Sequence, residues 1–159
     1  MLSKPNTIFI LGNNKLFSFI LNYKLSFVNR FEVVSFNTAK ESLEQINLKP
    51  DIIVFDKNYS ELNSFSQVLS QFSKISPTIS TIILFDKRDE LFVKELKMEH
   101  NCECLLRDED SSKMADKLIQ VIQTLVKTKR QSQLFFYLSI FLFFSFIIAA
   151  YTLVKLINT

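Results

Sequence analysis

The sequence predicts an α/β domain with a five-stranded parallel sheet, followed by a single transmembrane helix. Short apolar runs alternate with amphipathic helical stretches, which is the pattern of a parallel sheet covered by helices. The central apolar run shows no polar alternation, as expected for a strand that is buried on both faces. Near the C-terminus an uncharged stretch of 21 residues, 134–154, is long enough to span a bilayer.

The central strand is Ile52–Phe55, a short apolar run rich in β-branched residues. Pro50 and Asp56 bound it on either side, so it is too short for a buried helix. Open α/β folds place their sites where the strands end, and Asp56 stands at that edge of the predicted sheet.

Two strands and two helices are expected before this run, the strands at 7–11 and 31–36. The first helix starts after a turn at 12–14 and ends near residue 25. Its expected buried stripe repeats at helical spacing and consists of Leu16, Ile20, Tyr23 and Phe27, widened by Phe17 and Leu21.

The second helix begins with a capping box in which Thr38 and Glu41 each satisfy a backbone donor of the first turn. Its predicted buried residues are Leu43, Ile46 and Leu48, and it ends before Pro50.

After Asp56 the sequence predicts a third helix that ends at Pro77, a strand at 81–85, a fourth helix from about 89 to 99, a strand at 103–106 and a fifth helix after the acids at 108–110. The expected buried residues of the third helix are Leu62, Phe65, Leu69, Phe72 and Ile75. Those of the fourth are Leu91, Val93 and Leu96.

The composition argues against several classes of function. The net charge of +3 is too small to indicate a nucleic-acid partner. Cys102 and Cys104 are expected to be two reduced thiols on one face of a strand. The chain has no second cysteine pair and only one histidine, so we expect no zinc site. The residues form no nucleophile–base pair, and His100 is expected at the surface or at a helix end. We therefore expect no enzyme activity, no metal and no cofactor.

With its strands placed, the chain resembles the receiver domain of bacterial two-component response regulators, over residues 5–128. The most specific part of the resemblance runs from Thr38 to Asp56, where a capped helix leads into Pro50-Asp51 and a strand that ends in an aspartate. The resemblance implies a flavodoxin-like doubly wound sheet of order 2-1-3-4-5. It also implies that Asp56 stands at the position of the phosphoryl acceptor.

The other receiver positions depart from the family pattern. The acidic pair that helps receivers to bind magnesium is matched here by Gly12 and Asn13. The hydroxyl residue after the fourth strand is matched by Asp86, whose charge would repel a phosphoryl group. The lysine–proline pair after the fifth strand is matched by Arg107 and Asp108, so the cation remains and the proline does not.

Two interpretations of Asp56 follow. In the first, Asp56 is a strand-end carboxylate paired with Arg107, in a degenerate receiver that works without phosphorylation. In the second, Asp56 is phosphorylated in two-component signalling at the membrane. Asp86 is a further candidate partner for a cation.

The membrane segment, 134–154, is preceded by Lys127, Lys129 and Arg130 and followed only by Lys155. The positive-inside rule therefore places the N-terminal domain in the cytoplasm of a single-pass, tail-anchored chain with a short tail at 155–159. A buried core helix is the alternative, but a domain of this size cannot surround one. The basic and polar segment 129–133 contains no helix breaker, so either a continuous helix or a loose linker is possible there.

The predicted function is that of an interaction or scaffolding module at the cytoplasmic membrane, with an unknown protein partner. A subunit of a larger membrane complex is a further alternative. Residues 86–110 carry a net charge of −4, which suggests either a solvated face or a docking face for a basic partner. The candidate interaction residues are Glu90, Phe92, Glu95 and Glu99.

Overall fold

The computed structural model describes residues 6–12, 14–27, 31–56, 65–75, 78–99 and 102–157. Within these ranges, the side chains of residues 65–67, 90, 92–93, 99 and 149–157 are not described. The chain divides into two compact units, Met1–Gln120 and Val121–Thr159. Each unit is considered separately below.

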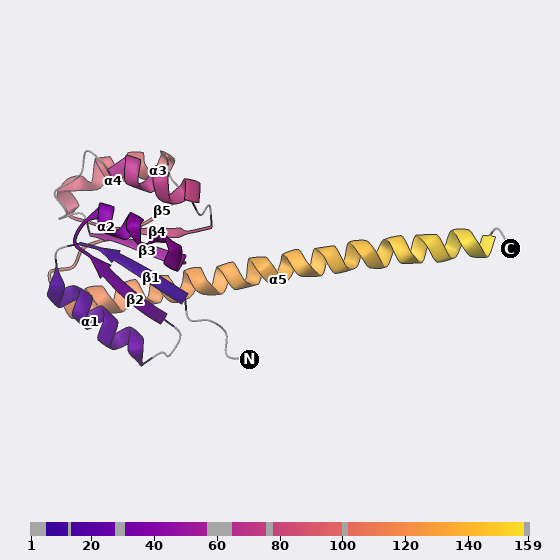
Figure 1. Ribbon diagram of the computed structural model, residues 1–159, viewed down its shortest axis with the longest axis horizontal. Helices are drawn as coiled ribbons and strands as arrows, with labels where there is room; N and C mark the ends of the chain where they lie inside the picture. Colours follow the sequence, from indigo (N-terminus) through magenta and orange to yellow (C-terminus); the bar gives the residue numbers. More distant parts are fainter. Residues whose placement is uncertain are drawn as a thin grey trace. The chain divides into compact units, whose positions relative to one another are not determined.

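Strands and helices alternate through the first unit (Figure 1). In chain order the elements are β1 (Asn6–Leu11), α1 (Lys15–Ser26), β2 (Phe31–Phe36), α2 (Ala39–Glu44), the 3₁₀ turn η1 (Ile46–Leu48), β3 (Ile52–Asp56), α3 (Phe65–Ile75), β4 (Ser80–Phe85), the 3₁₀ turn η3 (Lys87–Asp89), α4 (Glu90–Glu99), β5 (Cys102–Leu106) and α5 (Ser111–Ile157).

The sheet has the predicted architecture. Its strands lie in the order β2-β1-β3-β4-β5, and every neighbouring pair is parallel. β3 lies between β1 and β4, so all five of its residues are buried. This placement is the physical reason for its unbroken apolar run, because neither face of a central parallel strand meets solvent.

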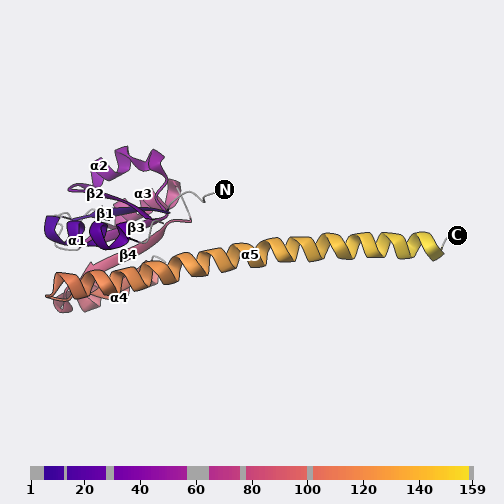
Figure 2. The ribbon, with the colours of Figure 1, turned by 90° about the horizontal axis from the view of Figure 1, so that it is seen from below.

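Helices cover both faces of the sheet (Figures 1 and 2). α2, α3 and α4 lie over one face, and α1 and the first turns of α5 lie over the other. Alternate residues of β3 therefore face different layers: Ile53 and Phe55 pack in a cluster with Leu69, Phe72 and other buried side chains. Apolar contacts between the helices and each face of the sheet stabilise the domain. They also fix the positions of the strand ends, which carry the polar residues.

The buried face of α1 differs from the predicted stripe. Phe17, Leu21 and Leu25 are its buried residues. Leu16, Tyr23 and Phe27 are 63%, 59% and 71% exposed, and Ile20 is half-buried. α1 carries two apolar stripes on different sides. The stripe that contains Phe17 and Leu21, which was predicted only to widen the buried face, is the one that packs against the sheet.

Three further residues that were predicted to be buried are exposed: Leu48 (41%), Ile75 (55%) and Leu91 (79%). Leu48 is exposed because α2 ends at Glu44 and a 3₁₀ turn shifts the phase of the side chains that follow. Ile75 ends α3 and Leu91 lies in the first turn of α4, where neither meets the sheet. Leu62 and Pro77 lie outside the described residues, as do the side chains of Phe65 and Val93.

The Thr38 half of the capping box is confirmed, because the Glu41 amide donates to the Thr38 hydroxyl at 3.1 Å. The Glu41 carboxylate accepts instead from the amide of Asn37, one residue before the cap, at 3.2 Å. The cysteine pair is also confirmed as two free thiols on one side of β5, with Sγ atoms 3.9 Å apart.

The second unit is helical as far as Ile157, and it belongs to α5. Helix α5 is therefore continuous through residues 129–133, rather than interrupted by a loose linker. It contains a stretch that is long and apolar enough to cross a membrane, with a mean hydropathy of 1.7 and no residue of that window buried in the protein. The hydroxyls of Ser139 and Ser145 donate to carbonyls four residues earlier in the helix, at 2.9 Å each, so these side chains need no partner in lipid.

Candidate functional site

Asp56 is the last residue of β3 and stands at the carboxyl edge of the sheet. It is only 4% exposed, because its backbone pairs with β4 opposite Leu84 and neighbouring side chains cover it. Burying an ionised carboxylate is costly unless a cation or several hydrogen bonds compensate. The surroundings of Asp56 must therefore supply compensating charge.

Arg107 supplies it. Its amide donates to the carbonyl of Phe85 at 2.8 Å, which extends the β4–β5 ladder by one residue and fixes the start of the side chain. The guanidinium forms an ion pair with the Asp56 carboxylate, as the sequence analysis expected. The two side chains are 20% and 5% exposed, and burial lowers the pKa of Arg107 from its usual range. A guanidinium nevertheless remains charged at neutral pH.

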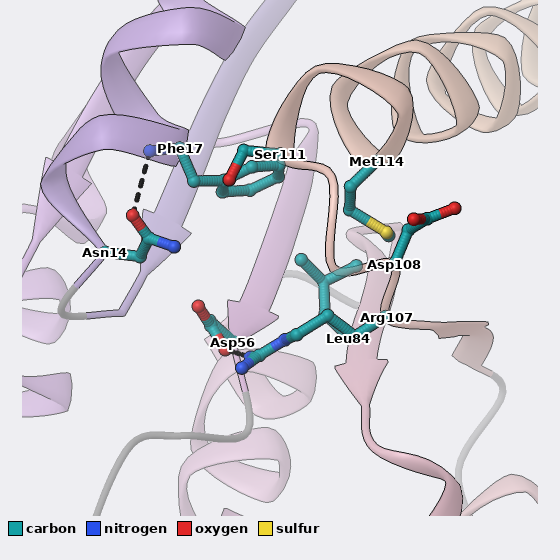
Figure 3. A pocket seen from close by; sticks show the side chains of 8 residues that line it. All are labelled: Asn14, Phe17, Asp56, Leu84, Arg107, Asp108, Ser111 and Met114. Atoms are coloured by element: carbon teal, nitrogen blue, oxygen red, sulfur yellow. Dashed lines mark hydrogen bonds and ion pairs between the residues drawn. The ribbon is translucent and has the colours of Figure 1, made fainter.

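The ion pair crosses a whole strand. β4 lies between β3 and β5, so the ends of these strands are about 10 Å apart at the usual strand spacing. The long Arg107 side chain spans this gap beside Leu84 and points at Asp56 (Figure 3). Only an extended cationic side chain reaches that far, which explains how residues 51 positions apart in sequence meet.

Asp86, which follows β4, lies next to the same guanidinium. One of its carboxylate oxygens is 3.9 Å from Nε of Arg107, and the other accepts from the Arg88 side chain at 3.3 Å. Asp86 thus shares the Arg107 cation with Asp56, as was considered from the sequence. We call Asp56, Arg107 and Asp86 the charged triad; its formal charge is −1.

Gly12 lies against Asp56 so closely that a side chain does not fit there. A Cβ placed on Gly12 would lie 2.6 Å from the Cβ of Asp56 and 3.3 Å from its Cγ. An aspartate at position 12 would need β1 and β3 to separate. Asn13 lies outside the described residues. Asn14 is committed to capping α1, because its side-chain oxygen accepts from the amide of Phe17 at 2.9 Å.

The space beside the charged triad is small. A cavity of about 20 Å³ is lined by Asn14, Phe17, Asp56, Leu84, Arg107, Asp108, Ser111 and Met114 (Figure 3). Such a volume holds about one water molecule. A phosphoryl group on Asp56 would therefore need the Arg107 side chain to move.

Asp108 is held away from the triad by partners of its own. Its carboxylate accepts from Lys117 at 2.8 Å and from the amide of Asp110 at 3.2 Å. These hydrogen bonds, that of Lys117 first, lower the pKa of Asp108 below its ordinary value. Asp110 in turn accepts from the amides of Ser112 and Lys113 and caps α5. Asp108, which stands at the position of the receiver proline, thus stabilises the start of α5 through its hydrogen bonds with Lys117 and Asp110.

A divalent-metal site needs several hard ligands at one point. In the part of the chain that the structure describes, no three His, Cys, Asp or Glu side chains form a group that could hold a metal ion. The charged triad offers two carboxylates, but the Arg107 guanidinium lies beside both.

The acidic interaction face falls on α4 and β5. Glu95 is exposed, whereas the side chains of Glu90, Phe92 and Glu99 are outside the described residues. The structure adds three exposed apolar residues that the sequence analysis did not assign to this face: Leu91 (79%), Met98 (82%) and Leu106 (49%). No sequence pattern marked Met98 as part of this face. Leu91 was assigned to the core because its spacing matched the helical repeat of the predicted buried residues.

No family model matches the chain, and no curated protein matches it. Solved structures do match the first unit. A response regulator receiver domain protein from Clostridium thermocellum is 21% identical, with a TM-score of 0.64, over 79% of this chain and 98% of that one. A response regulator receiver protein from Sinorhizobium medicae is 15% identical, with a TM-score of 0.60, over 77% and 95%.

The beryllofluoride-activated NtrC receiver domain is similar too, at 14% identity and a TM-score of 0.59, over 79% of this chain and 97% of that one. These similarities establish the fold. The first unit has the flavodoxin-like receiver-domain fold that the sequence resemblance implied, and a long apolar helix follows it.

Proposed function

We propose that this chain is a membrane-anchored degenerate receiver that binds a protein partner without being phosphorylated. The receiver fold supports a role in two-component signalling, in which receiver domains generally act as non-enzymatic signalling modules. In this proposal residues 5–128 are the interaction domain, 129–133 a juxtamembrane segment, 134–154 the membrane helix and 155–159 a short tail. The positive-inside rule places the domain in the cytoplasm.

One observation carries the proposal: the Arg107 guanidinium is paired with the Asp56 carboxylate, and the cavity of about 20 Å³ beside them has no room for a phosphoryl group. Asp86 adds a second negative charge next to the guanidinium. Gly12 has no room for the side chain that would supply a metal ligand. Phosphoryl transfer needs both positioned ligands and neutralised charge, and this pocket supplies neither to an incoming phosphoryl donor.

Partner binding is assigned to the acidic face of α4 and β5. Exposed apolar residues such as Leu91 and Met98 would supply the affinity, and the surrounding carboxylates would orient a basic partner. Binding through this face needs no change at Asp56, so the module would be constitutively active.

A working receiver is the second candidate, because Asp56 and Arg107 stand at the acceptor and cation positions. In that case Arg107 would have to release Asp56 and then bind the phosphoryl oxygens. Guanidinium groups bind phosphate well, so this exchange is chemically reasonable. Even after this exchange, the site would lack the acidic pair that helps receivers to bind magnesium.

Treatment of the full chain in nanodiscs with acetyl phosphate and magnesium separates the two functions. We expect no phosphoryl adduct by intact mass, either for the native chain or for Arg107→Lys, which keeps the cation. A phosphoryl adduct that is present in the native chain and absent from Asp56→Ala would establish the working receiver instead.

Capture of partners from membranes tests the interaction face. We expect the triple substitution Glu90→Lys, Glu95→Lys and Glu99→Lys to weaken capture without changing the fold or membrane insertion. The substitution Asp56→Asn should capture the same proteins as the native chain. Unchanged capture by the triple variant, at low and at physiological salt, would remove this face from the proposal.

A further inference from the structure

α1 presents a second apolar stripe that no part of the described protein covers. Its members are Leu16 (63% exposed), Phe19 (69%), Tyr23 (59%) and Phe27 (71%), with the half-buried Ile20 among them. At 3.6 residues per turn these side chains fall within a sector about 100° wide. The rings of Tyr23 and Phe27 touch edge to face, with centroids 4.9 Å apart, so the stripe is a continuous surface. We call it the α1 stripe.

The charged residues near the α1 stripe in the sequence have one sign. The first 31 residues of the chain include Lys4, Lys15, Lys24 and Arg30 and contain no Asp or Glu. Lys15 is exposed at the start of α1. Lys24 is matched by Asp116 of α5 at 2.7 Å, so it contributes less to the field than Lys15 does. Aromatic and aliphatic side chains flanked by lysine are the composition of helices that lie in a lipid interface.

The chain also brings such an interface within reach. The domain's last residue, Gln120, is joined to position 134 by helical residues of α5, a path of about 20 Å at 1.5 Å per residue. A bilayer that holds residues 134–154 therefore begins about 20 Å of chain beyond Gln120. Because the anchor already holds the chain at the membrane, a weak surface contact by the domain needs no separate recruitment from solution.

From these three observations we infer that the α1 stripe is a second membrane contact, which rests on the surface of an anionic bilayer while α5 anchors the chain. The inference goes beyond the proposed function and rests on its membrane anchoring. Phe19, Tyr23 and Phe27 enter the region between headgroups and acyl chains, where aromatic rings are favoured. Lys15 lies at the level of the anionic headgroups.

A second copy of the chain fits the α1 stripe less well. Four exposed side chains of this size offer roughly 400–600 Å² of apolar surface. A stable dimer buries about 800 Å² on each partner. The lysines on both faces would also repel each other across a symmetric contact, whereas anionic headgroups attract them.

Tryptophan fluorescence tests the inference, because the native chain contains no tryptophan. Three single-tryptophan variants of the full chain are placed in phosphatidylethanolamine–phosphatidylglycerol nanodiscs, one chain each, with or without brominated acyl chains. Phe19→Trp reports on the α1 stripe, Leu142→Trp on the membrane helix, and Met98→Trp on α4 is the matched exposed control. All three native side chains are largely exposed, at 69%, 59% and 82%.

We expect bromine to quench Phe19→Trp by roughly half, as for a ring a few ångströms below the headgroups, with a blue-shifted emission. Leu142→Trp should be quenched more strongly and Met98→Trp hardly at all. Adding Tyr23→Ser and Phe27→Ser to Phe19→Trp should reduce the quenching towards that of the α4 control. Both substitutions are at exposed positions, so the domain should still fold.

Quenching of Leu142→Trp without quenching of Phe19→Trp would overturn the inference and leave the anchoring intact. An unquenched Leu142→Trp would overturn both. A blue shift of Phe19→Trp that is independent of bromine, and that appears only when several chains share a nanodisc, would assign the α1 stripe to a second copy and overturn the lipid contact.

Discussion

Replacing Arg107 by methionine should destabilise the domain more than any other single change at the candidate site. The substitution keeps most of the apolar stem of the side chain but removes the guanidinium, and with it the charge next to Asp56, which is only 4% exposed. Removing one partner of a buried ion pair costs about 3–5 kcal/mol, because the other charge stays buried. Asp86, 3.9 Å from Arg107, makes the remaining carboxylates repel each other as well.

The reverse substitution, Asp56→Leu, should cost less. The Arg107 side chain is 20% exposed and still has Asp86 beside it, so we expect a loss of about 1–3 kcal/mol. The double variant, Asp56→Leu with Arg107→Met, should be less destabilised than Arg107→Met alone, since it leaves no buried charge at position 56 without a partner.

Urea unfolding of the full chain in nanodiscs, read by pulse proteolysis, measures these differences. With a urea slope of about 1–3 kcal/mol per molar, a loss of 3 kcal/mol shifts the midpoint by about 1–3 M. The reasoning is refuted if Arg107→Met leaves the midpoint unchanged, or if the double variant loses the sum of the two single losses. Either result would show that the ion pair contributes little to the free energy of unfolding.

Three further predictions follow from the structure. Gly12→Ala should cost about 1–3 kcal/mol, because its Cβ would overlap Asp56 at 2.6 Å; the same unfolding assay checks this, with Ser18→Ala on α1 as control. Asp108 has a lowered pKa in the folded protein, so it stabilises the fold above its unfolded pKa and loses this contribution as the pH falls through the folded value. Lys117→Gln should therefore lower the thermal midpoint at pH 7 and have almost no effect at pH 2, and an equal effect at both would contradict this. A chain that ends at residue 133 should move from the membrane to the soluble fraction on ultracentrifugation, and its persistence in the membrane would count against α5 as the anchor.

Most of the fold could be predicted from local signals in the sequence. The strand at Ile52–Phe55 was recognisable because a strand buried on both faces carries apolar residues at every position. The α2 cap was recognisable because Thr38 and Glu41 have the spacing of a capping box. The membrane segment was recognisable from its length and lack of charge alone, since the bilayer imposes both.

The candidate site was predicted in part. Asp56 and Arg107 each follow a strand, and the parallel order of the sheet places strand ends at one edge, so their proximity could be expected. Gly12 was noted only as a missing acid. Its contact with the Asp56 side chain depends on how β1 and β3 lie side by side, and that information is absent from either strand taken alone.

What the sequence by itself determined was the identity and order of the elements, because helical and strand periodicities, caps and hydrophobic length are properties of contiguous residues. What only the tertiary structure decided was which side of an element is covered. α1 carries two apolar stripes of similar strength, and periodicity alone cannot rank them. Packing against the sheet buries Phe17, Leu21 and Leu25 and leaves Phe19, Tyr23 and Phe27 uncovered by the described part of the domain, because burial depends on what lies opposite a side chain.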